Sequence, residues 1–149
     1  MSNPRWWVLL LVCAVATPVV AQERPVAGRI KVASGSAFIV RDGAQLPAQV
    51  GQVVFEADGL RTGGDGKVGV TLNDDTRLSL GPNSELTLQR FTYAPAERGF
   101  GLVLKFVRGA ATYVSGRIAK LAPDSIRLET PASIIGVRGT TLAIQVQPE

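Results

Sequence analysis

Apolar and polar residues alternate along most of this 149-residue chain. The segments 67–72, 77–80 and 85–88 each carry aliphatic side chains at every second position, with polar side chains between them. This alternation places the apolar side chains on one face of an extended strand, as a half-buried β-strand requires. Val70, Leu78 and Leu86 are spaced eight residues apart, and turn-forming residues lie between them. The pattern therefore predicts three consecutive short strands.

The same alternation continues on both sides of this region. It predicts further strands at 28–32, 35–41, 52–55, 102–107, 110–114, 125–129, 133–137 and 141–146. A short turn of helix is expected around 117–121, and a loop at 94–99 is expected to divide two lobes of a single domain. Many evenly spaced short strands predict an all-β fold, in a β-solenoid or β-roll-like arrangement or a sandwich, with a meander or barrel as alternatives.

The first 21 residues have the pattern of a secretory signal peptide. Arg5 gives a positive start, an apolar run covers 6–20, and Ala21 ends a pattern of small residues before a cleavage site. We predict cleavage after Ala21, a periplasmic or secreted location, and no stable membrane span in the mature chain. An uncleaved anchor helix is the alternative, but the run has 15 residues and contains Pro18, whereas a span needs about 20. Residues 22–149 then form one β domain, with its core at about 28–146.

The composition excludes several kinds of active site. The chain has no histidine and one cysteine, Cys13, which lies inside the predicted signal segment. Histidine general bases, Ser-His-Asp and Cys-His arrangements, and histidine or cysteine zinc sites are therefore excluded. We predict no cofactor, no metal site and no enzymatic activity.

Two adjacent carboxylates, Asp74 and Asp75, are the remaining candidates for acid–base chemistry. Neighbouring residues of a strand point to opposite faces, so the pair is poorly placed to act on one substrate. It also lacks the ligand spacing of a calcium-binding EF-hand loop. A solvated turn between two strands is the favoured interpretation.

The basic balance of the chain raises the question of nucleic acid. The isoelectric point is about 9.7, but Lys and Arg are scattered without runs, and the predicted export takes the chain away from nucleic acid. We therefore predict a different partner: an envelope protein, with a glycan or peptidoglycan as the alternative. The oligomeric state is left open.

Two stretches carry a resemblance to a known family. The first runs from Ala57 to Gly64 and continues from Gly69 to Leu86; it contains the pattern D-x-L-x-T-G and a strand pair around a turn. The second is the closing motif T-P-x-A-x-x-G-V-R-G-T. Here its predicted family-motif residues are Thr130, Pro131, Gly136, Val137, Arg138, Gly139 and Thr140. Together they resemble the FecR-type periplasmic domain over about 28–146, with Asp75 where the family commonly has Gly.

The resemblance implies a role in envelope signalling. FecR-type periplasmic regions receive a signal from an outer-membrane receptor and pass it towards a sigma factor. We expect this chain to lack the cytoplasmic region of a full regulator, so the hypothesis is a stand-alone, non-enzymatic module for sensing or protein interaction. The alternative is a structural subunit of the envelope that assembles by pairing its edge strands.

Physical arguments assign provisional roles to a few side chains. Strand glycines such as Gly136 and Gly139 usually mark bulges or close backbone approach. Arg138, between them, either locks the bend by bonding carbonyls or a carboxylate, or contacts a partner's carboxylate. Tyr93, Arg98 and Phe100 flank the predicted loop, where aromatic rings anchor a partner or cap the core. The candidate partner contacts are Tyr93, Arg98, Phe100 and Arg138.

Overall fold

The computed structural model describes residues 18, 23–139 and 141–147. Apart from Pro18, the predicted signal segment lies outside the described residues, and so does Thr140 of the closing motif. No helix within the described ranges has the length and apolar character needed to span a membrane.

The all-β prediction is confirmed, because the described residues form twelve strands and only three short helical turns. The strands are β1 (Val26–Ser34), β2 (Ala37–Arg41), β3 (Ala44–Pro47), β4 (Val53–Phe55), β5 (Gly59–Thr62), β6 (Lys67–Leu72), β7 (Arg77–Leu80), β8 (Glu85–Ala94), β9 (Gly99–Val114), β10 (Ile126–Glu129), β11 (Ile134–Gly136) and β12 (Thr141–Val146). The helical turns are η1 (Pro95–Glu97), α1 (Arg117–Leu121) and η2 (Pro123–Ser125). The helix expected around 117–121 is present.

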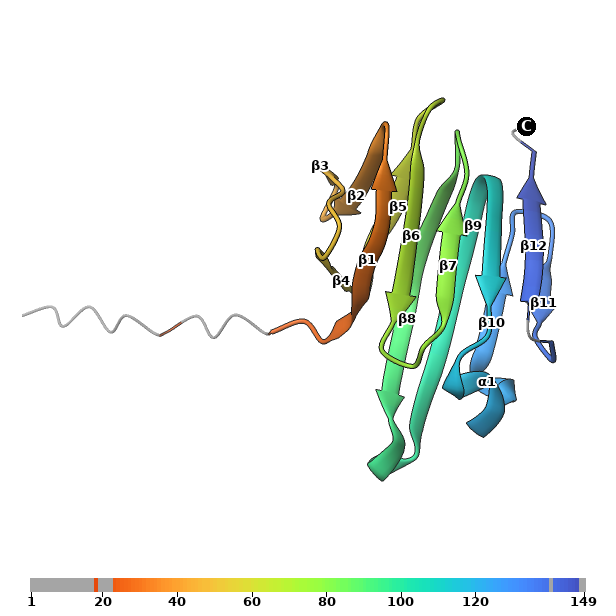
Figure 1. The fold of residues 1–149 in the computed structure, drawn as a ribbon. Coiled ribbons are helices and arrows are strands. Elements are labelled where there is room, and N and C mark those ends of the chain that lie inside the picture. The colour runs from red at the N-terminus through yellow and green to blue at the C-terminus, as the bar shows by residue number, and fades with distance from the viewer. Residues whose placement is uncertain (1–17, 19–22, 140, 148–149) are drawn as a thin grey trace, which may run out of the picture.

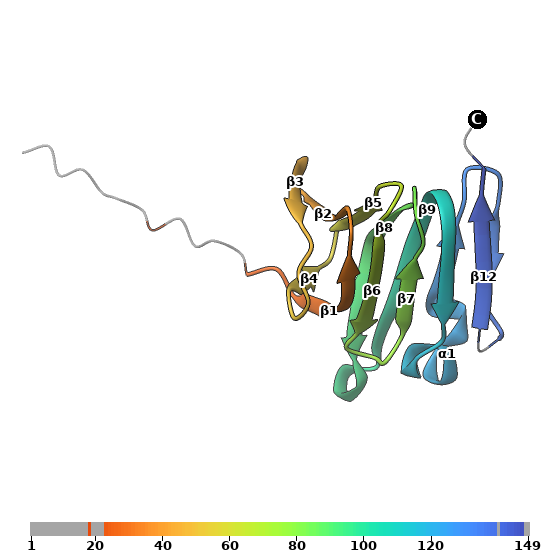
Figure 2. The ribbon, with the colours of Figure 1, turned by 45° about the horizontal axis from the view of Figure 1, so that its top comes forward.

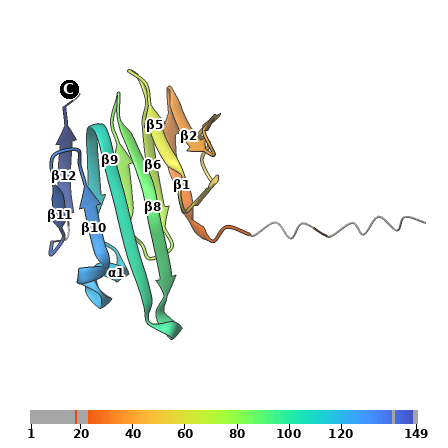
Figure 3. The same ribbon diagram turned by 180° about the vertical axis from the view of Figure 1, so that it is seen from behind.

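The strands join into one sheet that curls into an open half-barrel (Figure 1, Figure 2). We call β1, β6, β7, β12 and the last part of β9 the front limb; β2, β5, β8, β10 and the first part of β9 form the back limb (Figure 3). β9 belongs to both limbs, pairing first with β8 and β10 and then with β7 and β12. The finer expectation of a solenoid, roll or sandwich is not confirmed.

The alternating residues fill the space between the two limbs. From the front limb, Val70, Leu78 and Tyr113 are buried, and from the back limb Leu86 and Leu104 join the same apolar cluster. Complete burial of one such aliphatic side chain contributes about 1.5–3 kcal/mol. The faces predicted from period two are therefore the ones that the fold buries.

The loop at 94–99 does not divide two lobes. It is the tip of a long hairpin in which β8 and β9 pair from Glu85 with Arg108 to Ala94 with Gly99. The two strands extend well beyond the segments predicted at 85–88 and 102–107, and β3 and β5 were not predicted as strands at all.

Four turns connect the limbs at one end of the molecule, at the top of Figure 1. We call them the arches: 35–36, 63–66, 81–84 and the bend of β9 at Gly109. The arches are hydrogen-bonded to one another in this order. The N–H of Gly63 donates to the carbonyl of Ser36 at 2.8 Å, and the N–H of Asn83 donates to the carbonyl of Gly63 at 3.0 Å. The arches therefore extend the sheet's ladder around the corner.

Two buried hydroxyl groups complete this stack. The Thr62 hydroxyl donates to the carbonyl of Gly81 at 2.6 Å and accepts the N–H of Ser84 at 2.9 Å. The Ser84 hydroxyl donates to the carbonyl of Ala110 and accepts its N–H, both at 3.0 Å. Between the arches 35–36 and 63–66, hydrogen bonds from Ser36 hold the pKa of Asp65 below its ordinary value. Short polar side chains thus replace the backbone partners that a sharp bend removes.

Close approach in the stack requires glycine. A Cβ atom on Gly109, which has a φ of 85°, would lie 2.2 Å from the Ser84 hydroxyl oxygen. A Cβ atom on Gly66 would lie 2.1 Å from the carbonyl oxygen of Ser36. Side chains at these positions would push neighbouring arches apart.

Asp74 organises the opposite end, where α1 lies. The carboxylate is buried and accepts hydrogen bonds from the N–H of Thr76 at 3.1 Å and from its hydroxyl at 2.7 Å. The N–H of Ile118 in α1 also points to it, at 3.3 Å. Asp75, the next residue, has a φ of 68°, is exposed, and pairs with Arg117 at 3.0 Å. The interpretation of Asp74-Asp75 as a turn is therefore confirmed, but the turn is solvated only at Asp75.

We predict a graded cost for three glycine substitutions. Gly109→Ala combines a positive φ with a clash and should lower the free energy of unfolding by more than about 2 kcal/mol. Gly43→Ala has a positive φ but open space around it, and should cost about 1 kcal/mol. Gly136→Ala meets neither obstacle and should stay within about 0.5 kcal/mol. Urea unfolding followed by circular dichroism measures the series; equal losses would contradict the role of the arches.

The acidic turn gives a second prediction. Asp74→Asn places an amide N–H₂ against groups that are themselves donors and should lower the free energy of unfolding by about 1–3 kcal/mol. Asp75→Asn removes an exposed ion pair and keeps a residue that tolerates positive φ, so its cost should be below about 1 kcal/mol. The two urea midpoints provide the comparison. A larger loss in the Asp75 variant would overturn the assignment of Asp74 as the organising residue.

Candidate functional site

The first half of the closing motif forms a turn at the end of the molecule where the arches lie. The N–H of Thr130 donates to the carbonyl of Ser133 at 2.8 Å, and the Thr130 hydroxyl accepts the N–H of Ser133 at 3.1 Å. Pro131 is exposed within this turn, which joins β10 to β11. Thr130 and Pro131 thus terminate a strand pair.

The second half of the motif returns to the end where α1 lies. Val137 is 3% exposed and packs in the core, while the carbonyl of Gly139 accepts a hydrogen bond from the Ser115 hydroxyl. Gly136 and Gly139 have no positive φ, and a Cβ atom on either would meet no heavy atom within 4 Å. The expectation that these two glycines mark close backbone approach is wrong; that role belongs to glycines of the arches.

Arg138 is the charged residue of this motif, and it is exposed. It lines a hollow of about 400 Å³ beside α1. Lys120 lines the same hollow, with Ser115 and the apolar Val137. Among the described residues, no hydrogen bond or ion pair of the Arg138 side chain is formed that would lock the bend. The hollow therefore combines two cations with an apolar wall, an arrangement suited to a carboxylate or another anionic group.

Tyr93 and Phe100 lie directly opposite each other near the hairpin tip. Their ring centroids are 6.2 Å apart and the ring planes are tilted by 48°. Both rings are half-buried and pack against the core, so they cap it while keeping an exposed side. Arg98 is exposed, with a φ of 51° at the end of η1. The nearby Tyr93 hydroxyl, and then Asp75, raise the pKa of Arg117 above its ordinary value.

The four candidate contacts therefore gather at one end of the fold. The hairpin tip, α1 and the start of the turn after β11 lie at the same end, at the bottom of Figure 1 and again in Figure 3. We call this the lower end, and it carries Arg98, Lys120 and Arg138 as exposed cations. Lys120 was not among the predicted contacts, because only the folded chain places α1 next to the closing motif.

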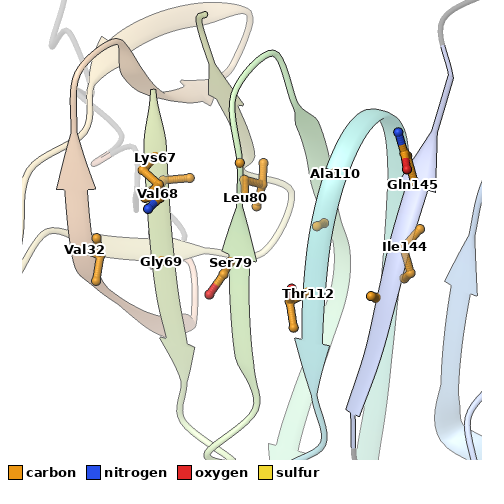
Figure 4. Close-up of a pocket in the computed structure, with 13 residues that line it drawn as sticks. Val32, Lys67, Val68, Gly69, Ser79, Leu80, Ala110, Thr112, Ile144 and Gln145 are labelled. Carbon is orange, nitrogen blue, oxygen red and sulfur yellow. The ribbon is translucent and has the colours of Figure 1, made fainter. Parts of the chain in front are cut away.

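A second feature, on the outer side of the front limb, was also missed from the sequence. A groove of about 740 Å³ crosses β1, β6, β7, β9 and β12 (Figure 4). A single cross-strand row forms its floor, running through Val32, Gly69, Ser79, Thr112 and Ala143. The signal lay in the small residues at alternate strand positions, but their alignment depends on strand order and register.

Metal-binding clusters are not found in the described part of the chain, where no three His, Cys, Asp or Glu side chains are grouped suitably. Two buried side-chain atoms in the same region lack a hydrogen-bond partner, the Tyr113 hydroxyl and the Nε of Arg61. Burial raises the pKa of Tyr113 above its ordinary value. Arg61 lies in β5 and Tyr113 in β9, and neither residue lines the hollow beside α1 or the groove of the front limb.

The chain matches the family described as FecR protein over residues 58–149, which includes β5 to β12 and the whole closing motif. Among solved structures, a cell surface anchoring domain is 26% identical, with a TM-score of 0.39; the match covers 41% of this chain and 82% of that one. The comparison with curated proteins finds no match. Because the family match spans more than half of the sequence, the chain belongs to the FecR protein family.

Proposed function

We propose that this protein is an exported, non-enzymatic interaction module that senses or scaffolds in the bacterial envelope. Membership of the FecR family supports an envelope-related role. The signal-peptide pattern of residues 1–21 supports export to the periplasm or beyond. The interaction is made at the lower end, with an envelope protein as the partner.

One observation carries this proposal: three segments that are distant in the sequence bring exposed cations to the same end. Arg98 comes from the hairpin tip, Lys120 from α1 and Arg138 from the closing motif. Thr130 and Pro131 form a turn, Gly136 ends β11 and Val137 packs in the core, whereas the exposed Arg138 guanidinium is available to an external partner. Its planar fork matches a carboxylate, and the hollow's apolar wall strengthens the pair by excluding water.

The half-buried rings of Tyr93 and Phe100 suit the same surface. Aromatic side chains that keep one face exposed beside cations are typical of residues that dominate protein interfaces. The lower end therefore offers anchoring rings and charge, whereas an enzyme would require an activated nucleophile or base. We expect the partner to present acidic side chains.

Photo-cross-linking in intact cells tests this function. A photoreactive residue in place of Ala96 or Asp124, both exposed at the lower end, should trap one reproducible envelope protein. The same residue in place of Gly64, at the arches, is the matched control and should not trap it. Adding Arg138→Ala should reduce the lower-end adduct several-fold, because the guanidinium is lost. Equal adducts from both ends, or none from Ala96 and Asp124, would overturn the proposal.

A structural role in envelope assembly is the second candidate, and β12 favours it. Among the described strands β12 pairs with β9 alone, and its six residues include no charge and no proline. Natural edge strands usually carry such residues to prevent pairing with other chains. A second copy could add its own β12 in antiparallel register, which gives a self-complementary dimer.

Sedimentation of the purified protein distinguishes this candidate. If β12 mediates assembly, a concentration-dependent oligomer should form, and Ala143→Lys on β12 should abolish it. Thr112→Lys makes the same change on β9, which is paired on both sides, and should leave the oligomer intact. A monomer at high concentration would eliminate the structural role.

A further inference from the structure

The front limb carries charged side chains of one sign, and the interaction proposed at the lower end does not involve them. Its strands β1, β6, β7 and β12, and the segment 110–114 of β9, contain no Asp or Glu. They carry four cations, Arg29, Lys31, Lys67 and Arg77, and all four are exposed. All the charged side chains on these strand segments are therefore basic.

The carboxylates at the two ends of these strands are already engaged. Asp65, in the arch before β6, accepts the N–H of Ser36 at 3.2 Å. Asp75, in the turn before β7, pairs with Arg117 at 3.0 Å. Among the described residues, no ion pair includes any of the four front cations, and the Arg29 guanidinium donates to the carbonyl of Gly51. Their charge is not compensated within this part of the fold.

The back limb is built differently. Arg41 is paired with the buried Asp58 at 2.7 Å, and Arg61 and Arg108 both approach Glu85, at 2.9 and 3.6 Å. Arg127 lies 4.0 Å from Glu129. Four of the six cations on the back-limb strands are thus paired, and Arg90 and Lys105 are the two outside the ion pairs of the described residues. On the front limb all four cations lack a carboxylate partner among the described residues, so its positive field is the less compensated one.

The cations frame the groove. Arg29, Thr71 and Arg77 lie in one cross-strand row at one side of the floor. Lys67, on the opposite side, lines the groove itself. With strands about 4.8 Å apart, five neighbouring strands give a track about 19 Å long. Ser79, Thr112 and Gln145 offer hydroxyl and amide groups along it (Figure 4).

We propose that this groove binds an anionic polysaccharide. The cations bind carboxylate or phosphate groups of the glycan, and the small floor residues let its sugars lie close to the sheet. Ser79, Thr112 and Gln145 exchange hydrogen bonds with sugar hydroxyl groups. The track is long enough for several sugar units.

Other anionic partners fit this face less well. A peptide lying across the strands would leave its backbone groups without ladder partners, since those of the sheet are used between neighbouring strands. A lipid surface favours large apolar or aromatic side chains for insertion, whereas the row of the floor contributes only Val32 and small residues. The experiment below measures binding to a representative of each of these two partners.

Titration calorimetry of the purified protein with polygalacturonate oligosaccharides, at low and high salt, tests the proposal. We expect saturable binding that weakens with salt, and no heat from neutral dextran. Lys67→Glu combined with Arg77→Glu should weaken binding by at least about tenfold. The matched control, Arg90→Glu with Lys105→Glu, makes the same charge change at exposed positions of the back limb and should alter it by less than about twofold.

A groove-filling variant separates the track from general charge attraction. Ala110→Trp keeps every cation but occupies the groove at an exposed position, and should reduce affinity several-fold. Equal losses in the front and back charge variants, unchanged binding by Ala110→Trp, or absence of binding would each overturn the proposal. Equal or tighter binding to phosphatidylglycerol vesicles or to poly-glutamate would also overturn it. Cross-links from the lower end test the protein partner separately, so failure of one proposal leaves the other standing.

Discussion

The hydrogen-bonded stack of arches is the constraint on which the fold depends. A sheet that turns sharply loses ladder partners at the bend, and a buried backbone group without a partner costs about 1–3 kcal/mol. Thr62 and Ser84 supply those partners with short hydroxyl groups, and glycines allow the arches to approach. The stack therefore sets the registration of the two limbs, so that alternate aliphatic residues of both limbs meet in one core.

Most residues of the FecR-type pattern in this chain have structural roles. In the stretch D-x-L-x-T-G, the Asp58 carboxylate is bound by Arg41 and by the N–H of Phe55, and Leu60 is in the core. Thr62 and Gly63, which follow, belong to the stack. The closing motif likewise contributes a turn and the buried Val137. Once these structural duties are assigned, the exposed Arg138 stands out, and this gives its proposed contact role physical grounds.

Local patterns predicted most of the strands and their buried faces, because alternation is a property of each segment alone, but they missed β3 and β5. They underestimated the hairpin of β8 and β9, since a bulge near Arg90 and the glycines 99 and 101 interrupt the alternation. They predicted close backbone approach at the glycines of the closing motif, whereas the glycines that lie against another segment are in the arches. Such contacts join segments that are distant in the sequence, so a local pattern does not reveal them. Tyr93, Arg98 and Arg138 were found as residue types in turns, but Lys120 and the front groove depend on strand order, which no single segment encodes.

The passage of β9 through both limbs has a mechanical meaning. Two separate sheets would come apart along an apolar interface, with water replacing one layer of contacts. Here one continuous backbone crosses from the back limb to the front limb and is hydrogen-bonded along both of its sides in each. The arches join the limbs covalently at one end, so a force pulling the limbs apart at the other end would bend β9 at Gly109 and strain the hydrogen bonds on both of its sides. Resistance to opening therefore comes from the ladders of β9 as well as from the apolar contacts between the limbs.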